Sequence, residues 1–261
     1  MYSYLQVEKE ANVATVIINN PPMNVLSEQV ASELCDAFTE IKDDQSIVTV
    51  ILTGEGDRAF MAGADIKEFP KMINQTPDID KQQPSKKSEV FRLIYEFPKP
   101  TIAYLNGMAL GGGFELALSC DMRIAEETVQ LGLPEVKLGL FPGGGGTQRL
   151  PRLIGTAKAK ELMFTGDQIS AQEALQLGII NQIATSEEGI DVARKLAKKI
   201  SRHSLQALRR IKQAVNEGTE GDLQEGLDLE SKLFQEIFTT EDMKEGVTAF
   251  LEKRRPVFTH Q

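Results

Sequence analysis

The hydrophobic residues near the start of the chain follow first a strand pattern and then a helix pattern. Val13–Ile18 is a β-branched apolar run that ends at the turn-forming residues 19–22, which predicts a strand. Ser27 then stands where a helix N-cap is expected, and apolar residues recur after it at the spacing of one helix face. These residues are Val30, Leu34, Phe38 and Ile41. The predicted order is therefore strand, turn and amphipathic helix.

This rhythm returns further along the chain. Residues 47–52 form a short, continuously apolar run of the kind found in buried strands. Residues 101–105 predict another strand, which leads through a glycine run into a predicted helix over 114–119, and a further strand is predicted near 122–125. The alternation favours an α/β fold class. Residues 70–88 interrupt it with three prolines, many polar residues and no periodic apolar face, so we expect a mobile surface segment there.

From about Thr156 onward the pattern predicts helices only. The predicted helices cover residues 157–164, 171–177, 190–200, 205–215 and 223–238, and a last one carries Met243, Val247, Phe250 and Leu251 on one face before Pro256. The economical interpretation is an α/β core over residues 1–195 and a helical C-terminal region over 196–261. We expect the C-terminal region to serve oligomerisation.

Composition restricts the class of protein. A chain of 261 residues with 41% hydrophobic content can bury a sizeable core, and no run approaches the roughly 18 apolar residues of a membrane helix. The first residues lack the basic and apolar regions of a secretion signal, so we expect a cytoplasmic protein. Cys35 and Cys120 are the only cysteines, and we predict that both are core thiols in a reducing compartment.

Charge and histidine content narrow the chemistry. The net charge is -9 with dispersed basic residues, which argues against a nucleic-acid surface. His203 and His260 are the only histidines, so a multi-histidine metal site or a Ser-His-Asp triad is improbable, and we predict both at the surface. Any catalysis must therefore use carboxylates and backbone groups.

Three segments carry candidate chemistry, namely residues 60–68, 106–115 and 133–149. Their glycine runs lack the signatures of phosphate-binding and dinucleotide-binding loops. Gly112 stands where a strand gives way to a helix, so its amide is expected to be an unpaired donor at the positive helix end. A second free amide near Ala64 would complete an oxyanion hole for a thioester carbonyl, in which loss of one donor costs about 3 kcal/mol of barrier.

Two glutamates lie within these segments. Glu115 is in the first turn of the predicted helix, where it is as well explained by the helix dipole as by catalysis if taken alone. Glu135 follows Pro134 among apolar neighbours, where a carboxylate is either solvent-facing or retained for function. Taken alone, Glu135 favours the surface interpretation.

Together these segments resemble the crotonase family, also called the enoyl-CoA hydratase/isomerase superfamily. The likeness also covers Val13 to Leu26, the residues Gly146-Thr147-Gln148-Arg149 that run on to Arg152, and the ending 249–254. Within the family, the chain is most similar to the bacterial enoyl-CoA hydratases of fatty-acid breakdown. The resemblance implies a fold of repeated β-β-α units with a helical C-terminal region.

The resemblance assigns roles to four residues. Ala64 and Gly112 would form the oxyanion hole, while Glu115 and Glu135, 20 residues apart as in hydratases, would be the catalytic pair. Glu115 would deprotonate a water that attacks the β-carbon of an enoyl-CoA, and Glu135 would protonate the α-carbon to give a 3-hydroxyacyl-CoA. No metal or redox cofactor is expected, because coenzyme A enters as part of the substrate.

The resemblance also implies contacts with coenzyme A and a homo-oligomer. The expected contact residues of one chain are Pro22, Met23, Val25, Leu26, Ala62, Asp65, Ile66, Lys67 and Pro134. Phe234, Phe250 and Lys253 match positions that a neighbouring chain contributes in family members. The expected assembly is a trimer or a dimer of trimers, without a nucleic-acid or membrane partner.

Several alternatives stay open. A positional isomerase that moves the double bond of an enoyl-CoA would share the oxyanion hole, and a short or branched 3-hydroxyacyl-CoA dehydratase would share the chemistry. A non-catalytic acyl-CoA carrier or an RNA-binding protein belongs to a different class. Met61, Gly144 and Gly145 depart from the common family pattern and could reshape the acyl pocket, as could the segment 70–88. The preferred acyl chain length is therefore open.

Overall fold

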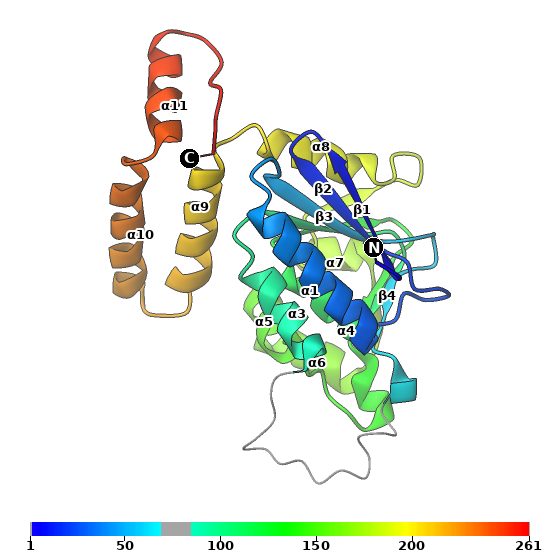
Figure 1. Ribbon diagram of the computed structural model, residues 1–261. Coiled ribbons are helices and arrows are strands. Elements are labelled where there is room, and N and C mark those ends of the chain that lie inside the picture. The colour runs from blue at the N-terminus through cyan, green and yellow to red at the C-terminus, as the bar shows by residue number, and fades with distance from the viewer. Residues whose placement is uncertain (1, 69–84, 261) are drawn as a thin grey trace.

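The computed structural model describes residues 2–68 and 85–260. It has an α/β body and, on one side of it, three C-terminal helices drawn in yellow to red in Figure 1. Most of the predicted mobile segment, residues 70–84, lies outside the described residues. For residues 85–88 the prediction of an irregular segment is wrong, because Ser85 caps a helix that begins at Lys86.

Within the described residues, the strands form a six-stranded sheet and a four-stranded sheet. The large sheet has the order β1-β2-β3-β5-β7-β10, and all its pairs are parallel except the β1-β2 hairpin. Its strands are β1 (Leu5–Glu10), β2 (Val13–Ile18), β3 (Thr49–Gly54), β5 (Thr101–Leu105), β7 (Met122–Glu126) and β10 (Gln182–Ala184).

The small sheet has the order β4-β6-β8-β9, in which β4, β6 and β8 pair in parallel and β9 is antiparallel to β8. Its strands are β4 (Ala59–Ala62), β6 (Met108–Leu110), β8 (Gln130–Gly132) and β9 (Gln168–Ser170). Consecutive strands alternate between the sheets, because β3, β5 and β7 belong to the large sheet while β4, β6 and β8 belong to the small one. In each β-β-α repeat, the first strand therefore joins the large sheet and the second strand joins the small sheet.

Helices cover both faces of the large sheet. The helices are α1 (Glu28–Asp43), α3 (Lys86–Tyr95), α4 (Gly112–Ser119), α5 (Gly146–Ile154), α6 (Thr156–Thr165), α7 (Ala171–Gln176), α8 (Asp191–Ile200), α9 (Leu205–Gly218), α10 (Leu223–Ile237) and α11 (Glu241–Leu251). The short 3-10 turns are η1 (Ile66–Glu68) and η2 (Pro134–Leu138). Alternate residues of β3 face different cores, since Val50 and Leu52 join the main core and Ile51 packs with α8. Burial on both faces explains the continuous apolar runs.

The helix over Glu28–Asp43 and the strands Val13–Ile18 and Thr101–Leu105 are confirmed, and the predicted strand over 47–52 begins two residues later. Ser27 caps α1 as predicted, because its side chain accepts a hydrogen bond from the amide of Val30 at 3.2 Å. Both cysteines are buried and free, as predicted.

The prediction of helices alone after Thr156 is wrong. Strands β9 and β10 lie in that part of the chain, and β10 completes the large sheet beside β7. Strands of three residues are too short to show a period of two, and their pairing is long-range. The short strands β4, β6 and β8 are absent from the prediction for the same reason, and β1, α3 and α5 are absent as well. The predicted boundary between residues 195 and 196 falls within α8, which packs on the large sheet.

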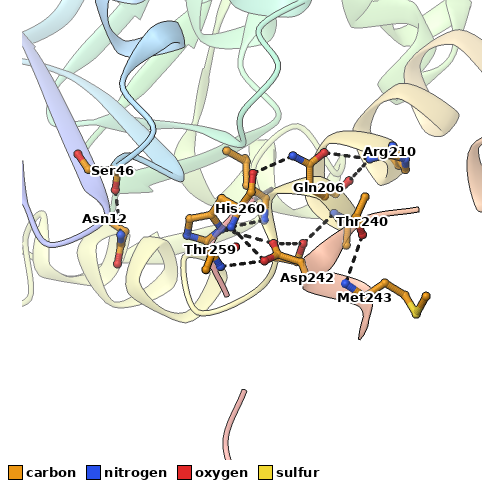
Figure 2. A network of polar contacts seen from close by, with 12 residues as sticks. Asn12, Ser46, Gln206, Arg210, Thr240, Asp242, Met243, Thr259 and His260 are labelled. Atoms are coloured by element: carbon orange, nitrogen blue, oxygen red, sulfur yellow. Dashed lines mark hydrogen bonds and ion pairs between the residues drawn. The ribbon is translucent and has the colours of Figure 1, made fainter. Parts of the chain in front are cut away.

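A buried carboxylate of α11 connects this helix with the start of α9 and with residues 259–260. Asp242, 1% exposed, accepts hydrogen bonds from Ser204 Oγ at 2.6 Å and from the amides of Thr259 and His260 at 2.8 and 3.0 Å. Figure 2 shows Thr259 and His260 directed toward this carboxylate. His203 is exposed as predicted, but the surface prediction for His260 is wrong. The chain folds back, and His260 Nδ1 accepts a hydrogen bond from the amide of Leu205 at the start of α9.

Within the described part of the chain, no helix is both long and apolar enough to cross a lipid bilayer.

We predict that Asp242→Ala lowers the free energy of unfolding by about 3 kcal/mol, because it leaves several buried donors without an acceptor. Urea denaturation at a fixed protein concentration measures this loss, and hydrogen exchange should become faster at the start of α9 and in residues 257–260. Glu241→Ala is the control, since that exposed carboxylate forms an ion pair with Lys244 and no other among the described residues. Equal stability of the two variants would contradict the prediction.

Candidate active site

The candidate site lies where three parallel strands of the small sheet end. Ala64 follows β4, Gly112 follows β6 and Glu135 follows β8. Because adjacent parallel strands run in the same direction, their carboxyl ends meet at one edge of the sheet. A cavity of about 470 Å³ opens there, and all three residues line it together with Glu115 of α4.

Ala64 and Gly112 lie close together at the wall of the cavity. Gly112 is the first residue of α4, so its N–H has no partner within the helix. Leu26 and Ala64 form an isolated β-bridge, whose hydrogen bonds use the carbonyl of Gly63 and the amide of Asp65. The N–H of Ala64 takes no part in this bridge. The Ala64 nitrogen lies 3.7 Å from the position that a Cβ of Gly112 would occupy. Among the described residues, neither amide donates a hydrogen bond.

The carboxylate of Glu115 accepts hydrogen bonds from a glycine loop. Its side chain is 3% exposed, and Oε1 accepts hydrogen bonds from the amides of Gly144 at 2.7 Å and Gly146 at 2.8 Å. Burial raises the pKa of Glu115, while these two amides and the positive charge of Arg149 act in the opposite direction. The carboxylate is therefore desolvated but supplied with fixed donors.

Glu135 has a different environment. It lies in η2, and its Oε2 is buried without a hydrogen-bond partner among the described residues. The pKa of Glu135 is raised to about 7, mainly by burial and to a smaller extent by the negative charge of Glu115, against the lowering effect of its own backbone amide. The two glutamates therefore differ, since Glu115 Oε1 has two amide donors while Glu135 Oε2 has no partner among the described residues.

Glycine is required beside both carboxylates. A Cβ at Gly111, where φ is 52°, would lie 3.0 Å from Glu135 Oε1. A Cβ at Gly144 would lie 2.8 Å from Glu115 Oε2 and 2.5 Å from the ring of Phe91. The glycines that the sequence shows in two runs therefore allow the carboxyl groups to approach the backbone closely.

The predicted contact residues divide into two groups. The residues that line the cavity together with the two glutamates and the two amides are Leu26, Ala62, Ile66 and Pro134. Those that do not line it are Pro22, Met23, Val25, Asp65, Lys67, Phe234, Phe250 and Lys253. Phe234 and Phe250 are 64% and 82% exposed on α10 and α11, which stand to one side of the α/β body in Figure 1.

The structure adds lining residues that the sequence interpretation missed. Lys87 and Phe91 come from α3, and Leu138, Leu140 and Phe141 come from η2 and the loop after it. Lys87 forms an ion pair with Glu68 at the edge of the cavity. The signal for α3 was present, since Ser85 is followed by Val90, Phe91 and Ile94 at helical spacing.

For the part of the chain that is described, no group of three or more His, Cys, Asp or Glu side chains is arranged to hold a metal ion.

Comparisons with known proteins agree with this geometry. The model of the enoyl-CoA hydratase/isomerase family matches residues 8–261. The chain is 43% identical to the crotonyl-CoA hydratase of Syntrophomonas wolfei over 98% of each chain, and 44% identical to the short-chain-enoyl-CoA hydratase of Clostridium acetobutylicum over 95% of each. A crystal structure of enoyl-CoA hydratase from Bacillus anthracis matches with a TM-score of 0.92 and 38% identity, covering 99% of this chain and 100% of that chain. These matches confirm the predicted fold class.

We predict that Glu135 titrates near pH 7 in the protein without ligand, because burial disfavours its charged form. In Glu115→Gln the pKa of Glu135 should fall, since a nearby negative charge is removed, but it should stay above 4.5 because the burial remains. Infrared difference spectra recorded against pH measure the carboxyl band, and Glu135→Gln assigns it. An unchanged pKa in Glu115→Gln would show that the two carboxyl groups do not interact.

Proposed function

Because this chain belongs to the enoyl-CoA hydratase/isomerase family, we propose that its cavity adds water across the 2,3 double bond of a short enoyl-CoA to give a 3-hydroxyacyl-CoA. Enoyl-CoA hydratase activity, a hydro-lyase reaction, follows from the similarity to two named hydratases over nearly the full chain. The observation that carries the mechanism is the contrast between Glu115, with two amide donors, and Glu135, with a pKa of about 7.

The mechanism assigns the base and the acid from this contrast. Glu115, whose carboxylate form is favoured by the amides of Gly144 and Gly146, holds and deprotonates the attacking water. Glu135 is substantially protonated at neutral pH and gives its proton to the α-carbon. The amides of Ala64 and Gly112 stabilise the negative charge that develops on the thioester oxygen between these steps. In this mechanism Glu115 is thus the base and Glu135 the acid.

Coenzyme A binding is proposed along two loops that are joined beside the oxyanion hole. The amide of Ala62 donates to the Met23 carbonyl at 3.0 Å, and the amide of Leu26 donates to the Gly63 carbonyl at 2.9 Å. The loops over residues 22–26 and 62–67 therefore form one continuous edge, to which the family resemblance assigns Pro22, Val25, Asp65 and Lys67. Their backbone connection supports the assignment, because a bent cofactor could contact both loops at once.

A short acyl chain is favoured by the named relatives and by the cavity itself. The curated relatives above are described as a crotonyl-CoA hydratase and a short-chain-enoyl-CoA hydratase. Phe91, 6% exposed, lines the cavity beside Gly144 and Glu115, and its ring lies 2.5 Å from where a Cβ of Gly144 would be. We therefore propose a four-carbon enoyl group as a good substrate.

The C-terminal helices support a homo-oligomer. Their residues buried within this chain are Leu205, Leu233, Asp242 and Ala249. Large apolar side chains remain exposed on them, as at surfaces that bind another protein. The most exposed are Leu223, Phe234, Phe250 and Leu251. We propose that these side chains contact a neighbouring chain in a trimer or a dimer of trimers; a cytoplasmic location also stays a proposal.

We predict that Glu115→Gln and Glu135→Gln each lower the kcat for hydration of crotonyl-CoA by about 100-fold to 10,000-fold, the usual contribution of general acid–base catalysis. Loss of absorbance of the conjugated thioester measures turnover, and calorimetry with a saturated acyl-CoA should show that binding is retained. Glu127→Gln, an exposed glutamate away from the cavity, is the control. Full activity in either active-site variant would remove that glutamate from the mechanism.

We predict a trimer or hexamer in light scattering at micromolar protein concentration, because the exposed side chains of α10 and α11 would be covered there. Phe234→Asp combined with Leu251→Asp should shift the protein toward smaller species. Substitution of the exposed Glu230 by Lys is the control for a change of surface charge. A monomeric wild-type protein would refute the proposed assembly.

A further inference from the structure

We propose that Arg149 is a positioning residue for Glu115, which it holds in place through the peptide of Gly144. Arg149 does not line the cavity, so it acts from behind the loop that carries the two amide donors. The inference rests on the proposed function, because it concerns the group that activates water there.

The loop over residues 143–146 forms hydrogen bonds with Glu115 and with Arg149. On the cavity side, the amides of Gly144 and Gly146 donate to Glu115 Oε1. On the opposite side, Arg149 Nη1 donates to the Gly144 carbonyl at 2.8 Å. The Gly145 carbonyl accepts the amide of Arg149 at 2.8 Å in the first turn of α5. The two amides that donate to Glu115 are therefore next to the carbonyls of Gly144 and Gly145, which accept hydrogen bonds from Arg149.

Glycine at position 145 is part of this arrangement. Gly145 has a φ of 107°, a conformation that other residues adopt only with strain. A Cβ there would lie 2.0 Å from Arg149 Nη1. The Gly-Gly-Gly-Gly-Thr-Gln-Arg sequence of residues 143–149 thus places the guanidinium directly against the loop backbone, which a larger residue at 145 would prevent.

The orientation of Arg149 is determined by a third element. Its guanidinium carbon lies 5.0 Å from the centre of the Tyr95 ring, at the end of α3, within the range of a cation–π interaction. The side chain is partly buried and faces a groove of about 480 Å³ between the body and α9. Tyr95, Arg149, Gly144 and Glu115 therefore form a continuous series of contacts from this groove to the cavity.

Arg149 also supplies charge. Its positive charge favours the carboxylate form of the buried Glu115, in addition to the two amide donors. Removal of the side chain should have two consequences: the loop and Glu115 become less well positioned, and the pKa of Glu115 rises. The pH at which activity is lost on acidification should then move to a higher value, because Glu115 must be ionised to act as the base.

The test compares Arg149→Met and Arg149→Lys with Arg152→Met. Arg152 lies one turn further along α5 and lines the same groove, but its contacts are with Gln148 and Glu220 rather than with Gly144. For Arg149→Met we expect kcat to fall by up to about 100-fold, the cost of a misplacement of about 1 Å, with little change in KM. Its acidic pH limb should move upward. Arg149→Lys should keep the pH limb nearer to wild type because it keeps the charge.

A second measurement does not depend on turnover. Infrared spectra of the protein without substrate, recorded against pH and assigned with Glu115→Gln, should show a raised pKa of Glu115 in Arg149→Met and an unchanged one in Arg152→Met. Thermal melting checks that each variant is folded. The inference is overturned if Arg149→Met keeps the wild-type kcat and Glu115 pKa, or if Arg152→Met reproduces its effects. An inactive wild type with the expected infrared shift would instead refute only the proposed reaction.

Discussion

Strands β4, β6 and β8 pair in parallel, so their carboxyl ends meet at one edge of the small sheet. The chain leaves each strand at that edge and delivers Ala64, Gly112 and Glu135 to one cavity. These residues come from three separate β-β-α units, and no local interaction would bring them together. The pairing of three short strands therefore determines whether these three residues share a cavity at all.

Two identical side chains acquire different properties in this cavity. Glu115 lies at the start of α4 and accepts hydrogen bonds from two glycine amides, so its charge is stabilised despite nearly complete burial. Glu135 has one buried oxygen without a partner among the described residues, and desolvation favours its neutral form. The proposed division into base and acid thus depends on the two glycine amides beside Glu115 and on the desolvation of Glu135.

The C-terminal helices follow a different principle from the body. The body buries apolar side chains on both faces of a sheet, whereas α9 and α11 are joined through the buried carboxylate of Asp242. Hydrogen bonds to one carboxylate specify direction, but they cover little apolar surface. This explains how the region can have a definite geometry and still expose the large side chains of α10 and α11.

Local patterns in the sequence were enough to predict much of the chain. The cap at Ser27, the helical stripe of α1 and the apolar run of β5 depend on nearby residues, and each was found at or close to its observed position. The motif residues Ala64, Gly112, Glu115 and Glu135 could also be named, because their types and spacing match those of a family. The roles given to them remain proposals.

The tertiary structure decided what depends on distant residues. Strands β4, β6, β8, β9 and β10 have three or four residues each, too few for a detectable period, and their pairing partners lie tens of residues away. The partial burial of His260 depends on residues 257–260 folding back, and the pKa shifts of the two glutamates depend on their burial and on the backbone amides beside them. The sequence alone determined which groups are available for chemistry. Their surroundings, which set their charge, arise only from contacts between distant segments of the folded chain.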